Sequence, residues 1–245
     1  MLSTIQAKIE RAKKHIHDLD VAIRTFCDSE PYTLGVEEKP KISHVAFYVR
    51  NVEPIPYEIP LTIGDAIHNL RSAFDHLNYQ LIEAGGGTPK PNSTFPICKT
   101  AQHYASAIGQ GEINKMRLGA EKLIRSIQPY ETGDSTLWNI HALDRVDKHR
   151  LVLTVTMTTT AWGVDVLGNR FMFPLIVSGP LIADDELVNV PTRTVKGTGK
   201  ENFKLGLDIT FGQSEIVAGK PVLETLNRMA DFASAIIPQF EPFLL

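Results

Sequence analysis

The sequence predicts an α+β protein, predominantly a helical bundle, with an N-terminal β-hairpin and a strand-rich insertion before the C-terminal helix. Apolar residues recur at three- and four-residue steps at the start, middle and end of the chain, as in amphipathic helices. Runs rich in β-branched and aromatic residues follow the first helix and precede the last. We expect a single domain, 1–245, with bundle segments at about 2–27, 61–84, 111–149 and 221–240 and the insertion at about 150–212.

The first helix is predicted from Leu2 to about Phe26. Its apolar stripe consists of Ile5, Ile9, Ala12, Ile16, Leu19 and Ile23, with lysines and arginines on the opposite face. Pro31 then interrupts helical structure. Two runs rich in β-branched and aromatic residues, 32–36 and 42–52, are separated by the polar stretch 37–41, so they predict a hairpin.

The second helix is predicted to begin after a proline-rich stretch. Pro54, Pro56 and Pro60 are expected to prevent regular structure before Leu61, and Thr62 is a suitable capping residue. Helical spacing then continues to residue 84, where three consecutive glycines end it.

In the second half of the chain, the spacing of the apolar residues changes from helical to strand-like and back to helical. After a proline-containing loop at 88–100, helical segments are predicted near 102–108 and 111–127, and Asp134 or Ser135 can cap another helix that runs to about Lys148. The β-rich runs 151–160, 171–179, 186–190 and 203–211 predict about four or five strands. Helical spacing returns from Val222 to about Phe240.

Composition and charge narrow the function classes. The chain is 43% hydrophobic and 22% charged, as in ordinary soluble globular proteins, and its net charge of -3 lacks the basic footprint of a strong duplex-DNA binder. Cys27 and Cys98 are too few for a disulfide scaffold. The charged N-terminal stretch has no apolar run of signal-peptide or membrane-span length, so we expect a cytoplasmic protein without a membrane partner. The sequence contains neither a GxGxxG nor a Walker A pattern, which disfavours nucleotide-dependent dehydrogenases and P-loop ATPases.

Two predicted helices carry an unusual concentration of titratable residues. On the long second helix, a polar face separate from the apolar stripe contains Asp65, His68, Arg71 or Ser72, and Asp75 or His76. The helix after residue 134 has the same character, with His141, Asp144, Arg145 and Lys148 on one face and Asp147 and His149 beside it. Exposed helices usually carry Lys and Glu, whereas His, Asp and Arg are typical of functional sites and of buried hydrogen-bond networks.

Three uses of these residues remain open. In the first, Arg71 and His76 cleave a phosphodiester without a metal or cofactor, because imidazole transfers protons near neutral pH and guanidinium stabilises phosphorane charge. In the second, histidines and aspartates of the two helices bind a divalent metal for hydrolysis, although the i, i+4 histidine pair of a helical zinc site is absent from the sequence. In the third, nothing is catalysed, and the polar helices form ion pairs or a docking surface.

The segment RSAFDH, which places four residues between Arg71 and His76, resembles the arginine–histidine motif of the HEPN superfamily. The wider string GDAIHNLRSAFDHLNYQL and the later LDRVDKHR are similar to segments of uncharacterised bacterial proteins. HEPN proteins are helical bundles that include metal-independent endoribonucleases of bacterial defence and toxin systems. The resemblance implies that Arg71 contacts the scissile phosphate of RNA, that His76 is the acid or base, and that two protomers bring their motifs together in a homodimer.

From these observations we expect an RNA-directed, metal-independent phosphodiesterase or a degenerate relative. Arg71 and His76 are the expected catalytic pair. The expected supporting residues are His68, Asp75, Asp65, His141, Asp144, Lys148 and His149. The alternatives are a non-catalytic helical interaction protein of a bacterial defence or regulatory system and, third, a metal-dependent hydrolase.

Overall fold

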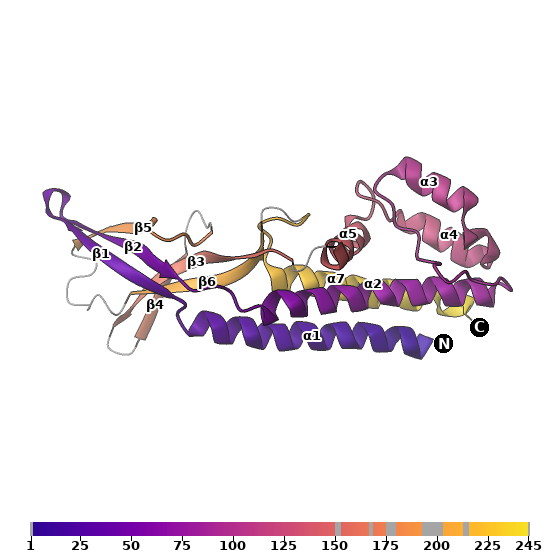
Figure 1. Ribbon diagram of the computed structural model, residues 1–245, viewed down its shortest axis with the longest axis horizontal. Helices are drawn as coiled ribbons and strands as arrows, with labels where there is room; N and C mark the ends of the chain where they lie inside the picture. Colours follow the sequence, from indigo (N-terminus) through magenta and orange to yellow (C-terminus); the bar gives the residue numbers. More distant parts are fainter. Residues whose placement is uncertain are drawn as a thin grey trace.

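The computed structural model has the predicted fold class, a mainly helical α+β arrangement with an N-terminal β-hairpin. Helices occupy one end of the elongated molecule and strands the other (Figure 1). The structure describes residues 2–149, 153–166, 169–174, 180–192, 203–212 and 216–244. Parts of the predicted insertion, including the second half of the expected strand at 171–179, lie outside the described residues.

Three helices lie side by side along the molecule (Figure 1). They are α1 (Leu2–Asp28), α2 (Glu58–Ala84) and α7 (Val222–Ile236), and a 3-10 helix, η4 (Ile237–Phe243), continues α7. The apolar stripe predicted on α1 is buried, with each member at most 4% exposed. Burial of each Ile or Leu side chain contributes about 1.5–3 kcal/mol, so this stripe holds α1 against the other two helices. No helix within the described ranges has the length and apolar character needed to cross a membrane.

Helix α2 begins earlier than the sequence predicts, at Glu58 instead of Leu61. Pro60 was expected to delay the helix, but it occupies the third helical position. Proline is tolerated in the first turn because the first N–H groups of a helix have no acceptor within it. Thr62 is therefore inside the helix. The residue before the first residue of α2 is Tyr57, whose side chain makes no capping hydrogen bond.

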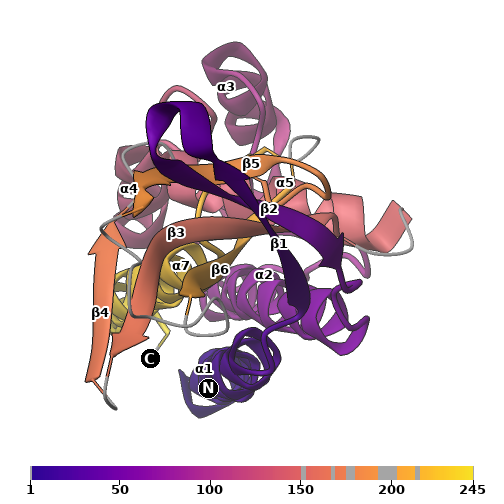
Figure 2. The ribbon, with the colours of Figure 1, turned by 90° about the vertical axis from the view of Figure 1, so that its left-hand side faces the viewer.

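Helix α5 (Ser135–His149) crosses α2 at a steep angle and packs against both α2 and α7 (Figure 1, Figure 2). Asp134 caps it as predicted, because one carboxylate oxygen accepts the N–H groups of Thr136 at 2.9 Å and Leu137 at 3.1 Å. Leu137, Ile140 and Leu143 are fully buried beneath the helix. This crossing brings the titratable face of α5 against the middle of α2.

Shorter helices lie near the C-terminal end of α2 (Figure 1). They are α3 (Ala101–Gln110), the 3-10 helix η2 (Glu112–Lys115) and α4 (Leu118–Ile127). The segment predicted as one helix over 111–127 is thus two, because the backbone is extended at Met116 and Arg117. Arg117 fixes this break to the end of α2, since its Nε donates to the carbonyl of Ala84 at 3.1 Å.

The strands in the described ranges form two three-stranded antiparallel sheets. The first has the order β1 (Tyr32–Lys39), β2 (His44–Val52), β5 (Glu186–Pro191), and the second β4 (Asn169–Pro174), β3 (Val155–Val166), β6 (Phe203–Phe211) (Figure 2). The predicted hairpin is therefore joined by a strand from the predicted insertion.

The polar stretch 37–41 is mostly strand, contrary to the sequence prediction. Glu37, Glu38 and Lys39 continue β1 opposite Ala46, Val45 and His44, and only the 3-10 turn η1 (Pro40–Ile42) separates the strands. Charged residues are accommodated because this part of β1 is exposed or half-buried. Lys39 also donates to Glu186 of β5 at 2.8 Å, which ties the three strands together.

Candidate functional site

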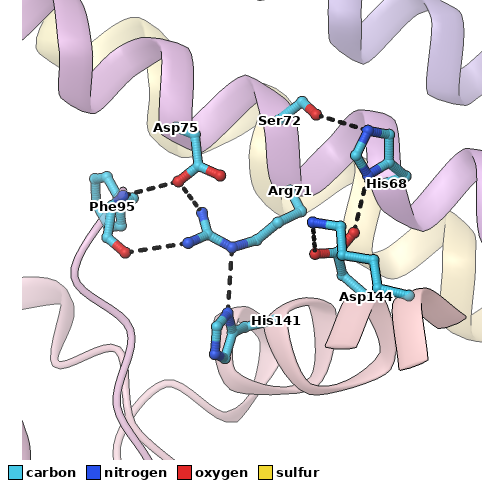
Figure 3. Close-up of polar contacts among 8 residues, drawn as sticks. His68, Arg71, Ser72, Asp75, Phe95, His141 and Asp144 are labelled. Atoms are coloured by element: carbon cyan, nitrogen blue, oxygen red, sulfur yellow. Dashed lines mark hydrogen bonds and ion pairs between the residues drawn. The ribbon is translucent and has the colours of Figure 1, made fainter. Parts of the chain in front are cut away.

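The titratable faces of α2 and α5 meet and form two adjacent clusters (Figure 3). Within each cluster the two contributors on α2 are four residues apart, and His141, Asp144 and Lys148 of α5 follow one another at three and four residues, so the members of each cluster lie on one side of their helix. We call the first group the Arg71 cluster: Arg71, Asp75, Phe95 and His141. We call the second the His68 cluster: His68, Ser72, Asp144 and Lys148.

The Arg71 guanidinium joins three segments of the chain. It donates from Nη1 to Asp75 Oδ1 at 2.5 Å, from Nη2 to the carbonyl oxygen of Phe95 at 3.3 Å, and from Nε to His141 Nδ1 at 3.3 Å. The N–H of Phe95 in turn donates to Asp75 Oδ1 at 2.8 Å. The Arg71 side chain is only 4% exposed, so this charge is held inside the protein by α2, α5 and the loop between α2 and α3.

Burial perturbs two titratable groups of this cluster. Desolvation raises the pKa of Asp75, while the neighbouring Arg71 opposes that rise. Desolvation, followed by the positive charges of Arg71 and Arg145, lowers the pKa of His141 to about 4. His141 is therefore neutral at pH 7. Because arginine can only donate, His141 Nδ1 is the acceptor and its proton lies on Nε2.

The His68 cluster is more accessible to solvent. His68 Nδ1 donates to Asp144 Oδ1 at 3.0 Å, and Lys148 Nζ donates to the other oxygen of Asp144 at 2.6 Å. The Asp144 side chain is 4% exposed, whereas those of His68 and Lys148 are 49% and 48% exposed. The Ser72 hydroxyl is 3.4 Å from His68 Nε2. With the proton on Nδ1, Nε2 faces that hydroxyl as an acceptor. Ser72, His68 and Asp144 thus follow one another in the order of a nucleophile, a base and a carboxylate that orients the base.

Gly64 leaves room on α2 for the Asp147 side chain of α5. A Cβ at Gly64 would lie 2.5 Å from Asp147 Oδ1, so any larger residue would displace that carboxylate. The pKa of Asp147 is raised by its burial and then by the negative charges of Asp144 and Asp65. The Asp147 carboxylate thus lies within electrostatic range of Asp144, Asp65, His68 and Lys148.

The structure brings together six of the nine expected site residues and leaves three outside the two clusters. The six are His68, Arg71, Asp75, His141, Asp144 and Lys148. Asp65, His76 and His149 are exposed, and their side chains make no hydrogen bond or ion pair with any described residue. His76 follows Arg71 by five residues, which turns it about 140° around the helix axis.

Three contributors were not selected from the sequence as site residues. Ser72 was only an alternative to Arg71 on the polar face, and nothing in its spacing indicated a contact with His68. The carbonyl of Phe95 had no sequence signal, because backbone acceptors are independent of residue type. Gly64, in contrast, stands inside a long helical pattern, where a glycine costs about 1 kcal/mol relative to alanine, and that cost indicates a packing requirement.

No protein-family model, curated protein or solved structure matches this chain. In the part of the chain that the structure describes, no three His, Cys, Asp or Glu side chains are arranged to hold a metal ion. What the site offers chemically is a half-exposed imidazole beside a buried carboxylate and an ammonium group.

Proposed function

We propose that the protein is a metal-independent phosphodiesterase acting on RNA, in which His68 is the acid–base group. The observation that carries this proposal is the bond from His68 Nδ1 to the buried Asp144, which leaves Nε2 of a half-exposed ring with only the long contact to the Ser72 hydroxyl, at 3.4 Å, that a substrate hydroxyl can replace. A carboxylate behind an imidazole fixes its tautomer and stabilises the protonated form produced during the reaction. His68 can therefore remove a proton from a substrate hydroxyl.

The nucleophile in this reaction is the 2′-hydroxyl of RNA. The Ser72 hydroxyl, 3.4 Å from His68 Nε2, marks the position from which that base accepts a proton. As His68 Nε2 takes the proton of the 2′-hydroxyl, the 2′-oxygen attacks the adjacent phosphorus and the bond to the 5′-oxygen breaks. The leaving 5′-oxygen takes a proton from water, so a 2′,3′-cyclic phosphate and a 5′-hydroxyl result, and protonated His68 returns its proton to the solvent. Lys148 is half-exposed next to His68 and supplies positive charge for the phosphorane oxygens.

Arg71 has a positioning role in this proposal. Its side chain is 4% exposed and holds α5 and the loop at Phe95 against α2, so it sets the place of Asp144 without reaching the phosphate. His76, the partner of Arg71 in the motif resemblance, lies outside both clusters. His68 and His76 are therefore alternative candidates for the acid–base group on one helix. Replacing each of them in turn by glutamine distinguishes the two.

The experiment is cleavage of labelled total RNA and of a tRNA pool in excess EDTA by the wild type, His68→Gln and His76→Gln. We expect His68→Gln to lose about 10²–10⁴-fold in rate, the usual contribution of general acid–base catalysis, and His76→Gln to retain activity. The opposite pattern would restore the Arg71–His76 assignment. Folded wild-type protein that leaves RNA intact would overturn the phosphodiesterase proposal.

The second candidate is a non-catalytic interaction protein that assembles as a homodimer within a bacterial defence or regulatory system. The observation that favours it is the Arg71 cluster, in which each guanidinium nitrogen already has an internal partner. Such ion pairs commonly hold helices together without any chemistry. Sedimentation equilibrium with and without RNA tests this candidate, since it requires a dimer whose mass does not respond to RNA.

A further inference from the structure

A pocket of about 350 Å³ is lined in part by three members of the Arg71 cluster, Arg71, Phe95 and His141. Arg71, Asn78 and His141 contribute from α2 and α5, and the loop at 90–98 and residues of η2 complete the walls. Its volume is at the lower end of the range for small-molecule sites, about 300–1,000 Å³. The pocket can thus enclose a small metabolite but not a folded partner.

Asn78 is a buried polar side chain without a partner in this pocket. The residue is 4% exposed, and its amide makes no hydrogen bond with any described residue. Its amide is not sealed off, because Gln80 Oε1 is the one side-chain nitrogen or oxygen atom of the described residues that is fully buried without a partner, so the Asn78 amide is open to the pocket. Asn78 therefore presents two donors and an acceptor to whatever occupies the pocket.

The other polar groups around the pocket mostly donate. His141 Nδ1 is taken by Arg71, so the remaining ring nitrogen carries its proton. Arg71 and Lys90 are cationic, whereas Glu112 is the one carboxylate among the lining residues. That carboxylate accepts from the Ser93 hydroxyl and from Lys115, so it is already engaged. The free hydrogen-bonding capacity therefore favours an acceptor-rich, negatively charged ligand.

Apolar side chains line the remainder of the pocket, including Phe95, Pro96, Ile97 and Ile113. An oxyanion alone would leave this wall uncovered, whereas a ligand with a flat ring next to its anionic group would contact both parts. We propose that the pocket binds a small phosphorylated molecule with a ring, of the size of a nucleoside monophosphate. Asn78 would recognise its polar edge and Lys90 its phosphate.

The proposal is tested by isothermal titration calorimetry of the full chain with 5′-UMP, uridine and inorganic phosphate. We expect 5′-UMP to bind at least about tenfold more tightly than uridine, because only the former carries the phosphate. Lys90→Gln, a change at an exposed position, should remove that preference without affecting the fold. Absence of 5′-UMP binding, or equal binding of uridine and 5′-UMP, would overturn the proposal.

Asn78→Leu gives a second signature that a merely structural asparagine would not show. Leucine has nearly the same shape but no hydrogen-bonding groups, so the ligand-free variant should keep the melting temperature of the wild type while it loses at least about tenfold in affinity for 5′-UMP. Asn69→Leu is the matched control on the same helix, because Asn69 already donates to the carbonyl of Asp65 and does not line the pocket. A lower melting temperature with unchanged affinity for Asn78→Leu would refute the role of its amide.

Binding at this pocket does not depend on the proposed cleavage reaction. None of the lining residues belongs to the His68 cluster, so His68→Gln should bind 5′-UMP as the wild type does. Loss of RNA cleavage with intact 5′-UMP binding would refute only the phosphodiesterase, and the reverse result would refute only the pocket.

Discussion

Arg71→Met removes the buried ion pair at the centre of the Arg71 cluster and keeps a long apolar side chain in its place. The variant loses the contacts of the guanidinium with Asp75 at 2.5 Å, with the Phe95 carbonyl at 3.3 Å and with His141 at 3.3 Å. Water cannot fully replace them, because the Arg71 side chain is only 4% exposed. The Asp75 carboxylate, 27% exposed, is left with the N–H of Phe95 as its remaining donor.

The expected loss of stability follows from this geometry. Removing one partner of a buried ion pair costs about 3–5 kcal/mol, because an uncompensated charge remains. Asp75 keeps one hydrogen bond and some contact with water, so we expect the lower end, about 3 kcal/mol. For a domain of this length 1 kcal/mol shifts the melting temperature by about 2–4 °C, so Tm should fall by about 6–12 °C.

Differential scanning calorimetry of Arg71→Met and Arg24→Met measures this effect against a matched control. Arg24 makes the same kind of pair with a residue four positions away, Asp20 at 2.8 Å, but its side chain is 73% exposed. Exposed pairs contribute little, so Arg24→Met should hardly change Tm. Burial already raises the pKa of Asp75, so the deficit of Arg71→Met should also shrink in mild acid, where that carboxyl is protonated. Equal shifts in Tm for the two variants would refute the reasoning.

Three further variants have defined outcomes. The pKa of His141 is lowered to about 4 in the folded state, so the stabilising contribution of the neutral ring is present above about pH 6.5 and is lost as the pH falls toward 4. Denaturation by urea at pH 7 and pH 5 should therefore show that His141→Gln loses less stability between these pH values than the wild type does. The expected difference is about 1–2 kcal/mol after allowance for partial exposure. Leu70→Ala, at a fully buried position of α2, should cost about 2–5 kcal/mol in the same assay, and a loss below 1 kcal/mol would contradict its core position. Thr100→Ala removes the side-chain cap that accepts from the His103 N–H at 3.2 Å, so amide exchange should quicken in the first turn of α3 with a cost of about 1 kcal/mol.

The helices were predictable because their signals are local. An apolar stripe determines which face of α1 is buried, whatever it packs against, and Asp134 caps α5 through atoms two and three residues away. The start of α2 at Glu58 differs from the predicted Leu61 because the sequence prediction gives every proline the same helix-breaking effect. Its effect depends on position, and in the first turn Pro60 loses no intrahelical hydrogen bond.

The pairing of strands was not accessible in the same way. Nothing in the residues of β2 indicates that its second neighbour is β5, from which it is separated by more than a hundred residues. Pairing of this kind depends on which faces remain uncovered after the helices have packed. The sequence predicts that strands exist in both regions, but their division into two sheets follows from the whole fold.

The candidate site shows the same boundary between local and long-range information. Helical spacing places His68 and Arg71 on the polar face of α2, and this part of the prediction needs no knowledge of which helix packs against that face. The motif resemblance, however, links Arg71 to His76, whereas the crossing of α5 provides His141 as the histidine that contacts Arg71. The Asn78 amide lies on the same helix and has no sequence signal, because its significance depends on the loop that forms the other wall of the pocket.

The two clusters are coupled because both span the same pair of helices. His141 and Asp144 are three residues apart on α5, as are His68 and Arg71 on α2, so each cluster joins one turn of α2 to one turn of α5. Loss of the Arg71 contacts therefore loosens α5, the helix that carries Asp144. His68 then loses the orientation that Asp144 gives it, although the substitution is not at His68 or at Asp144. Loss of RNA cleavage in Arg71→Met would thus be ambiguous. The comparison that separates positioning from catalysis is His68→Gln, which should lower the rate of cleavage about 10²–10⁴-fold while the Arg71 cluster and the melting temperature remain close to those of the wild type.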